Sequence, residues 1–151
     1  MKRVGLYCGT FNPIHNGHKN IIDKSLRMFD KAIVGIGLNT AKDGSNTMYA
    51  RQATLQELLP DVTVMAYQGL TVNLIKHLQE ILVDSTITLI RGLRDSNDLD
   101  YETKTLRFNQ DMMPDINVIM VLCDREYSHL SSSSIRALEK IDKGLGERYT
   151  L

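Results

Sequence analysis

Cysteine, proline and tryptophan are scarce in this sequence: the 151 residues include two cysteines, three prolines and no tryptophan. Two cysteines are too few for the framework of a disulfide-rich secreted domain. Cys8 and Cys123 both lie in apolar, strand-like runs, so we expect buried, reduced thiols in a cytoplasmic protein. A single bridge between these two cysteines is the alternative.

The sequence also lacks an excess of either charge, because 18 basic residues balance 18 acidic ones. Balanced charge and an aromatic content of only 6% argue against a nucleic-acid-binding module. No stretch approaches the ~18 apolar residues of a membrane span, and the basic start does not resemble a signal peptide because no apolar run of sufficient length follows it. The length predicts one domain over residues 1–151.

Short apolar runs alternate with helical patterns along the whole chain. The runs lack the polar–apolar alternation of half-exposed strands, so we expect strands that are buried on both faces. This pattern predicts an α/β fold, a doubly wound five-stranded parallel sheet with helices on both faces. The predicted strands are Val4–Cys8, Ala32–Leu38, Val62–Ala66, Thr86–Ile90 and Asn117–Cys123. The predicted helices are Gly17–Phe29, Tyr49–Leu59, Leu70–Leu82, Asp98–Met113 and Ser132–Lys143.

Four segments that contain candidate functional residues follow predicted strands: residues 9–18, 39–46, 91–94 and 124–134. In such a sheet the carboxyl ends of the strands share one edge, where ligands bind. We therefore expect these four segments to converge.

The first of these segments is Gly-Thr-Phe-Asn-Pro-Ile-His-Asn-Gly-His, starting at Gly9. A glycine at the end of a strand and a helix that begins near Gly17 would offer backbone N–H groups to a phosphate. His18, in the first helical turn, could donate to a phosphate oxygen. The alternatives are a plain strand-to-helix turn and a metal site at His15 and His18, although no cysteine or carboxylate cluster accompanies these histidines.

The other segments carry cations and hydroxyl groups. Arg91 and Arg94 flank a Gly-Leu pair, and a guanidinium grips phosphate oxygens bidentately. A run of serines, residues 131–134, precedes a predicted helix and suits both an N-cap and phosphate oxygens. Lys42 could neutralise charge between two reacting phosphates. The alternatives are surface arginines, a flexible serine loop and a solvated lysine.

The first segment resembles the signature of the nucleotidyltransferase superfamily with the His-x-Gly-His motif, which joins a nucleoside triphosphate to an acceptor. Arg-Gly-Leu-Arg from Arg91, followed by Asp-Leu-Asp-Tyr-Glu from Asp98, resembles the phosphopantetheine adenylyltransferases in particular. The resemblance implies a Rossmann-like nucleotidyltransferase fold. It also implies adenylyl transfer from ATP to 4'-phosphopantetheine in coenzyme A biosynthesis, with Mg²⁺ held through the ATP phosphates.

The resemblance further implies roles for individual residues. Thr10, His18 and Lys42 would be catalytic. Thr10, Lys42, Thr71 and Arg91 would bind the acceptor. The residues around ATP would be Thr10, Phe11, His18, Gly92, Leu93, Arg94, Glu102, Tyr127, Ser128, His129, Leu130, Ser131, Ser132 and Ser133. A homo-hexamer and coenzyme A as a feedback ligand are implied as well.

The sequence departs from the family pattern at several positions. Asn12 stands where an aspartate is usual, Cys8 replaces a proline, Tyr127 replaces a tryptophan, and His129 replaces a hydrophobic residue. The chain also lacks a final helix that the family pattern leads us to expect. A nicotinate or nicotinamide mononucleotide adenylyltransferase is the alternative enzyme, and a non-catalytic nucleotide-binding protein on the same fold is the alternative of another class.

Overall fold

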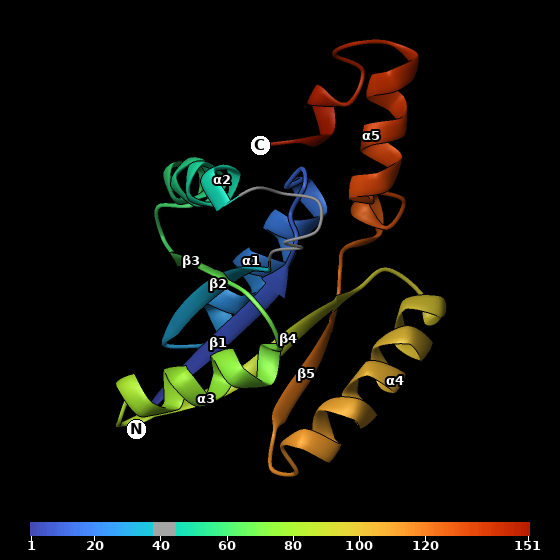
Figure 1. Cartoon of the computed structure of the whole chain (residues 1–151). Coiled ribbons are helices and arrows are strands. Elements are labelled where there is room, and N and C mark those ends of the chain that lie inside the picture. Colours follow the sequence, from blue (N-terminus) through green and yellow to red (C-terminus); the bar gives the residue numbers. More distant parts are fainter. Residues whose placement is uncertain (38–44) are drawn as a thin grey trace.

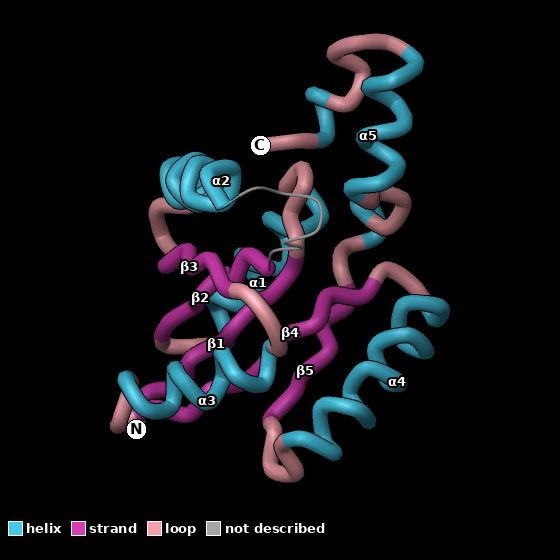
Figure 2. Tube along the Cα trace, in the orientation of Figure 1, coloured by secondary structure: helices cyan, strands magenta, loops and turns pink. Residues whose placement is uncertain are grey.

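The computed structural model describes residues 1–37 and 45–151, and only the backbone of residues 45–48. The described strands form one parallel sheet in the order β3-β2-β1-β4-β5 (Figure 1). The strands are β1 (Lys2–Gly9), β2 (Lys31–Gly37), β3 (Thr63–Tyr67), β4 (Ser85–Leu93) and β5 (Asn117–Leu122). The α-helices are α1 (Asn16–Met28), α2 (Ser45–Leu58), α3 (Thr71–Ile81), α4 (Ser96–Met112) and α5 (Ser132–Ile141). Two short 3-10 helices, Arg125–Tyr127 and Glu147–Tyr149, follow β5 and α5 (Figure 2).

The sheet is covered on both faces because its strands are apolar on both faces. Side chains of β1 alternate between two cores: Leu6 packs against α3, whereas Tyr7 packs with residues of α1 and α2. The predicted doubly wound fold is therefore confirmed. The two cysteines lie in different cores, Cys8 toward α3 and Cys123 toward α1, and both thiols are free. The alternative of a disulfide bridge is wrong, because the sheet separates the two thiols.

The predicted end of the fourth strand at Ile90 is wrong, since β4 continues to Leu93. The extension is stabilised by β5, which pairs Arg91 with Met120 and Gly92 with Val121. Successive residues of a strand point to opposite faces of the sheet. The extension therefore directs the Arg91 side chain to the α3–α4 face and position 92 to the α1 face.

The strand order reverses at β1, which lies between β2 and β4. Ligands of open α/β sheets bind at such a reversal, in the crevice outside the carboxyl ends of the strands. Helix α5 stands beyond this end of the sheet (Figure 1). The last residues of the chain return to the same place, where Thr150 pairs with His15 in an isolated antiparallel bridge. Within the described parts of the chain, none of the helices has the length and apolar character that crossing a bilayer requires.

Candidate functional site

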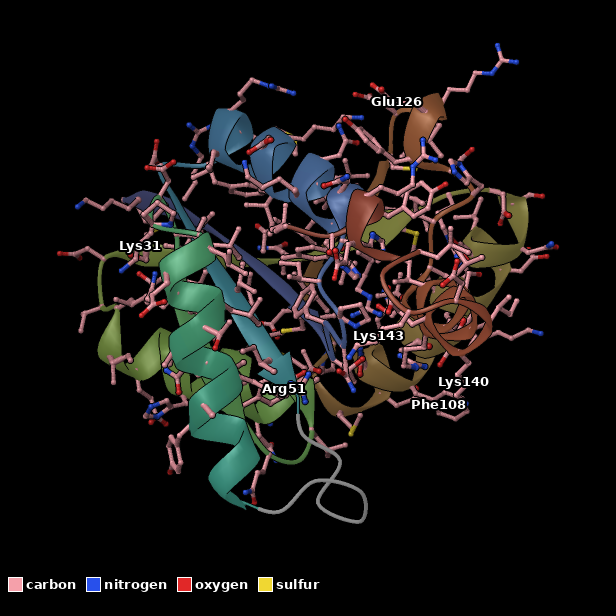
Figure 3. The ribbon with its side chains drawn as sticks, turned by 90° about the horizontal axis from the view of Figure 1, so that it is seen from above. Lys31, Arg51, Phe108, Glu126, Lys140 and Lys143 are labelled. Atoms are coloured by element: carbon pink, nitrogen blue, oxygen red, sulfur yellow. The ribbon has the colours of Figure 1, made fainter. Side chains whose placement is uncertain are left out.

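The loop after β1 makes a tight turn into α1. Phe11 has a positive φ of 47°, and its ring is buried. A Cβ on Gly9 would lie 3.1 Å from that ring, so glycine permits the close approach. Arg51 of α2, which lies near the carboxyl end of the sheet when the molecule is seen from above (Figure 3), donates to the carbonyl of Thr10. Arg136 of α5 donates to the carbonyl of Asn12, so cationic side chains from two helices hold the loop.

His15 and His18 form a capping box at the N-terminus of α1. The His15 Nδ1 accepts the backbone N–H of Gly17 at 3.1 Å, and the His18 Nδ1 accepts the backbone N–H of His15 at 3.1 Å. The two rings stack with centroids 3.7 Å apart. Because the Nδ1 atom of His18 is an acceptor, the neutral ring carries its proton on Nε2 and can donate it to a ligand.

Both histidines are neutral near pH 7. Burial lowers the pKa of His18 to about 3, with further lowering by His15 and Arg94. Burial also lowers the pKa of His15 to about 4, with a smaller contribution from Arg94. The site therefore offers His18 as a neutral hydrogen-bond donor, and an anionic ligand bound beside it would favour its protonation.

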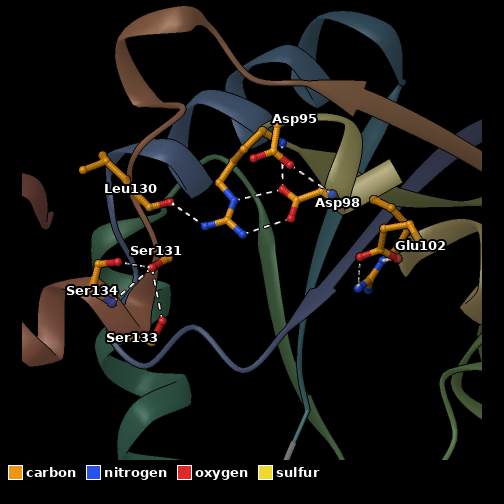
Figure 4. A network of polar contacts seen from close by, with 9 residues as sticks. Asp95, Asp98, Glu102, Leu130, Ser131, Ser133 and Ser134 are labelled. Carbon is orange, nitrogen blue, oxygen red and sulfur yellow. Dashed lines mark hydrogen bonds and ion pairs between the residues drawn. The ribbon is translucent and has the colours of Figure 1, made fainter. Parts of the chain in front are cut away.

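Arg94, which directly follows β4, pairs with Asp98 in the first turn of α4; Figure 4 labels Asp98 together with Asp95 and Leu130. The Arg94 Nε and Nη2 donate to the two carboxylate oxygens of Asp98 at 2.9 and 3.0 Å, and its Nη1 donates to the Leu130 carbonyl at 3.3 Å. Asp95 caps the same helix by accepting the backbone N–H of Asp98 at 3.0 Å. These contacts join β4, α4 and the loop before α5 into one wall.

The serine run forms the N-terminus of α5. Ser131 is the N-cap, with its Oγ accepting the backbone N–H of Ser134 at 3.0 Å, as the predicted helix start requires (Figure 4). Ser132 Oγ donates to the Pro13 carbonyl at 2.8 Å and joins this turn to the loop after β1. The N-termini of α1 and α5 therefore meet at the same end of the sheet, and each presents backbone N–H groups and the positive end of its dipole.

These walls enclose a cavity of about 540 Å³, called here the larger cavity. Its volume lies within the range of small-molecule sites. The predicted site residues that line it are His18, Gly92, Leu93, Arg94, Glu102, Tyr127, Leu130, Ser131 and Ser132. The lining residues to which the family resemblance gives no role are Tyr7, His15, Gly17, Ile21, Asn97, Asp98, Tyr101 and Cys123. Asp98 and Tyr101 belong to the Asp-Leu-Asp-Tyr-Glu motif, which could have indicated them.

Other predicted residues lie outside the lining of this cavity. Thr10 is exposed at the end of β1, and Phe11 is buried, with its ring 4.9 Å from the ring of His18 in an edge-on contact. His129 is exposed and contacts the ring of Tyr149. Ser128 Oγ donates to the Arg125 carbonyl, and Ser133 is exposed. The predicted Lys42 lies outside the described residues.

A smaller cavity of about 200 Å³ lies on the α3–α4 face. Arg91 and Thr71, two predicted acceptor-binding residues, both line it. Arg91 makes a bidentate ion pair with Glu102, from Nε at 2.7 Å and from Nη2 at 2.9 Å, and its Nη1 donates to the Cys8 carbonyl at 3.3 Å. Burial alone would lower the pKa of Arg91, but the hydrogen bonds and charge of Glu102 outweigh it and the pKa is raised.

The two cavities lie on opposite faces of the sheet and meet at one residue. Glu102 of α4 is 8% exposed and lines both of them. His18 and Arg91 therefore line different cavities, although both belong to segments that we expect to converge. They flank the carboxyl ends of β1 and β4 from either side instead.

The carboxylates of the larger cavity are not arranged as a metal cage. Asp98 is paired with Arg94 and Glu102 with Arg91. Among residues 1–37 and 45–151, no three histidine, cysteine or acidic side chains are grouped so that they could hold a metal ion. Both histidines of the predicted loop use Nδ1 as an acceptor, and the described residues lend no support to a metal site there.

Comparison with known proteins identifies the family of this chain. The model of the cytidylyltransferase-like family matches residues 6–138. A phosphopantetheine adenylyltransferase of Levilactobacillus brevis is 34% identical over 91% of this chain and 83% of its own length. The phosphopantetheine adenylyltransferase of Streptococcus sanguinis is 38% identical, and the match covers 90% of this chain and 82% of the relative's length. Among solved structures, a Vibrio parahaemolyticus protein described as a putative nicotinate-nucleotide adenylyltransferase superimposes with a TM-score of 0.64 over 95% of this chain and 86% of its own chain. Because the two sequences are only 18% identical, this likeness shows a shared fold alone. The chain therefore belongs to the cytidylyltransferase-like family and, within it, to the phosphopantetheine adenylyltransferases.

Proposed function

We propose that the protein transfers the adenylyl group of ATP to 4'-phosphopantetheine, with ATP in the larger cavity and the acceptor phosphate at Arg91 in the smaller one. One observation carries this assignment of sites. Two cavities lined by different arginines lie on the two sides of the strand-order reversal and share Glu102 as a common wall. A reaction between two anions needs such separate sites that meet at one point.

The transfer itself is an in-line displacement. An oxygen of the acceptor phosphate forms a bond to the α-phosphorus of ATP, while the bond from that phosphorus to the bridging oxygen of the β-phosphate breaks. Dephospho-coenzyme A and pyrophosphate are the products. Because no new proton acceptor is needed, the work of the protein is positioning and electrostatic stabilisation.

His18 is the central donor in this mechanism. Its Nδ1 is occupied by the His15 N–H, which leaves the Nε2–H as the donor, and His18 lines the larger cavity beside the N-terminus of α1, where negative charge would develop on the α-phosphate. The N-terminus of α5, at Ser131 and Ser132, is the second group of donors and would hold the triphosphate. Thr10 and Lys42 remain predicted contacts to the reacting phosphates.

The residues present fit Mg²⁺ that arrives on the triphosphate. Since Asp98 and Glu102 are both engaged by arginines, phosphate oxygens and water would supply most of its ligands. Bound there, the ion would neutralise charge on the phosphates. We further propose a cytoplasmic enzyme, with coenzyme A as a feedback ligand and a homo-hexamer as the assembly.

An acceptor panel tests the function. Purified protein is mixed with ATP and Mg²⁺ and with either phosphopantetheine, nicotinate mononucleotide, nicotinamide mononucleotide or no acceptor, and pyrophosphate release is followed. Release that depends on phosphopantetheine supports the proposal. Release with a mononucleotide instead identifies the alternative enzyme, and ATP binding without release for any acceptor identifies a non-catalytic nucleotide-binding protein.

A further inference from the structure

Tyr7 lines the larger cavity but has no role in the mechanism proposed above. It lies in β1 opposite Ile90 of β4, and the whole residue is 8% exposed. Its ring packs edge-on against Phe11, with centroids 5.3 Å apart. The ring is thus fixed in the core, while Tyr7 also contributes to the lining of the larger cavity.

The Tyr7 hydroxyl makes no hydrogen bond to any described residue. In contrast, every side-chain nitrogen or oxygen of the described residues that is wholly inaccessible has a partner. The hydroxyl is therefore accessible from the cavity, at the end of an otherwise buried side chain. A hydroxyl that opens onto a cavity and has no protein partner is free to make a hydrogen bond to a ligand there.

The position of this hydroxyl is defined from two sides. A Cβ on Gly92 would lie 3.3 Å from its oxygen, which places it beside the predicted ATP-binding segment of β4. It also lies within electrostatic range of Arg91 and Glu102, the pair that borders the smaller cavity. The ring centroid is 6.4 Å from that of His18. The hydroxyl is therefore near the junction of the two cavities, on the same side as His18.

We propose that the Tyr7 hydroxyl donates a hydrogen bond to a phosphate oxygen at the point of adenylyl transfer, as a second catalytic donor beside His18. This inference rests on the proposed adenylyl transfer. No bond to Tyr7 forms or breaks; the proton stays on the phenol and the hydrogen bond strengthens as charge grows on the oxygen. Burial raises the pKa of Tyr7, so the phenol keeps its proton throughout the working pH range.

The test is Tyr7→Phe, which keeps the buried ring and removes only the hydroxyl. The matched control is Tyr49→Phe, because Tyr49 is 68% exposed on α2 and outside both cavities. Removing one preorganised donor lowers kcat by roughly 100-fold. We expect that loss for Tyr7→Phe, with the KM for ATP within about threefold of wild type. The reverse reaction, from dephospho-coenzyme A and pyrophosphate, should lose the same factor in kcat/KM, and Tyr49→Phe should match wild type.

The possible outcomes distinguish a failure of the Tyr7 role from a failure of the proposed adenylyl transfer. If the wild-type protein releases no pyrophosphate with phosphopantetheine, the proposed function fails. If the wild type is active and Tyr7→Phe keeps kcat within twofold, the proposed function stands and the role of Tyr7 is refuted. A rise in KM at unchanged kcat also refutes it, because the hydroxyl would then bind the ground state only. A circular dichroism spectrum and a melting temperature close to wild type confirm that the ring still packs.

Discussion

The ion pair between Arg91 and Glu102 leads to a quantitative prediction about Glu102→Gln. The substitution keeps the shape of the side chain but removes the only carboxylate that pairs with Arg91 among the described residues. The side chains are 26% and 10% exposed, so the guanidinium would be left largely buried without a counter-ion. Removing one partner of a fully buried pair costs 3–5 kcal/mol, and the partial exposure of Arg91 reduces this to about 2–3 kcal/mol.

The expected change in melting temperature follows from that energy. For a chain of this size, 1 kcal/mol corresponds to about 2–4 °C, so Glu102→Gln should melt roughly 5–10 °C below wild type. Calorimetry without ligand measures this difference. The control is Asp30→Asn, which breaks a similar Arg–Asp pair whose side chains are 64% and 44% exposed, and it should change the melting temperature much less.

The same variant should respond more strongly to ligand than wild type. The acceptor phosphate would supply the counter-ion that Arg91 has lost, so phosphopantetheine should raise the melting temperature of Glu102→Gln by more degrees than that of wild type. If the variant melts within 2 °C of wild type, cavity water solvates Arg91 adequately and the argument from burial is refuted. If ligand stabilises both proteins equally, the acceptor phosphate does not bind at Arg91.

Three further predictions concern the larger cavity. His18→Ala should lower kcat for pyrophosphate release by roughly 100-fold or more while ATP affinity, measured by calorimetry, stays within about tenfold; a large loss of affinity with the fold intact would make His18 a binding residue. His15 has a pKa lowered to about 4, so the folded state takes up fewer protons than the unfolded state between pH 6.5 and 4, and stability should fall as the pH falls through this window. His15→Asn keeps a good N-cap and should make the melting temperature less dependent on pH there; an unchanged slope contradicts the assignment. Gly92→Ala would place a Cβ 3.1 Å from the buried Ile21 side chain and 3.3 Å from the Tyr7 hydroxyl, so we expect both the melting temperature and the ATP affinity to fall, whereas unchanged affinity would remove Gly92 from the ATP site.

The elements of the fold could be predicted because each strand consists mainly of apolar and β-branched residues. The end of β4 is an exception. Arg91 interrupts the apolar run, so the sequence predicts that the strand ends at Ile90, one residue before it. Only pairing with β5, a contact distant in sequence, keeps residues 91–93 in the sheet. That register decides which face each residue takes, and hence that Arg91 and His18 line different cavities. No local pattern contains this information.

The site could be predicted in part for a similar reason. Residues in motifs next to a strand end, such as His18, Arg94 and Ser131, were found because the topology of a parallel sheet brings these ends together. The pattern predicts Tyr7 only as a residue of the strand Val4–Cys8, since nothing in the sequence distinguishes a phenol in a core from a phenol that opens onto a cavity. Thr150, which pairs with His15, was missed because a single bridge has no sequence pattern.

The described part of the site has little net charge to attract its substrates. Arg91 and Arg94 are each matched by a carboxylate, and both histidines are neutral near pH 7. The positive potential that remains comes from the N-termini of α1 and α5 and from fixed donors such as the His18 Nε2–H. Fixed dipoles need no reorganisation when charge develops, and they act most strongly where water is excluded. A site of this kind suits a reaction in which the number of charges is conserved and only their position changes, because the protein needs to stabilise a redistribution of charge rather than a new ion.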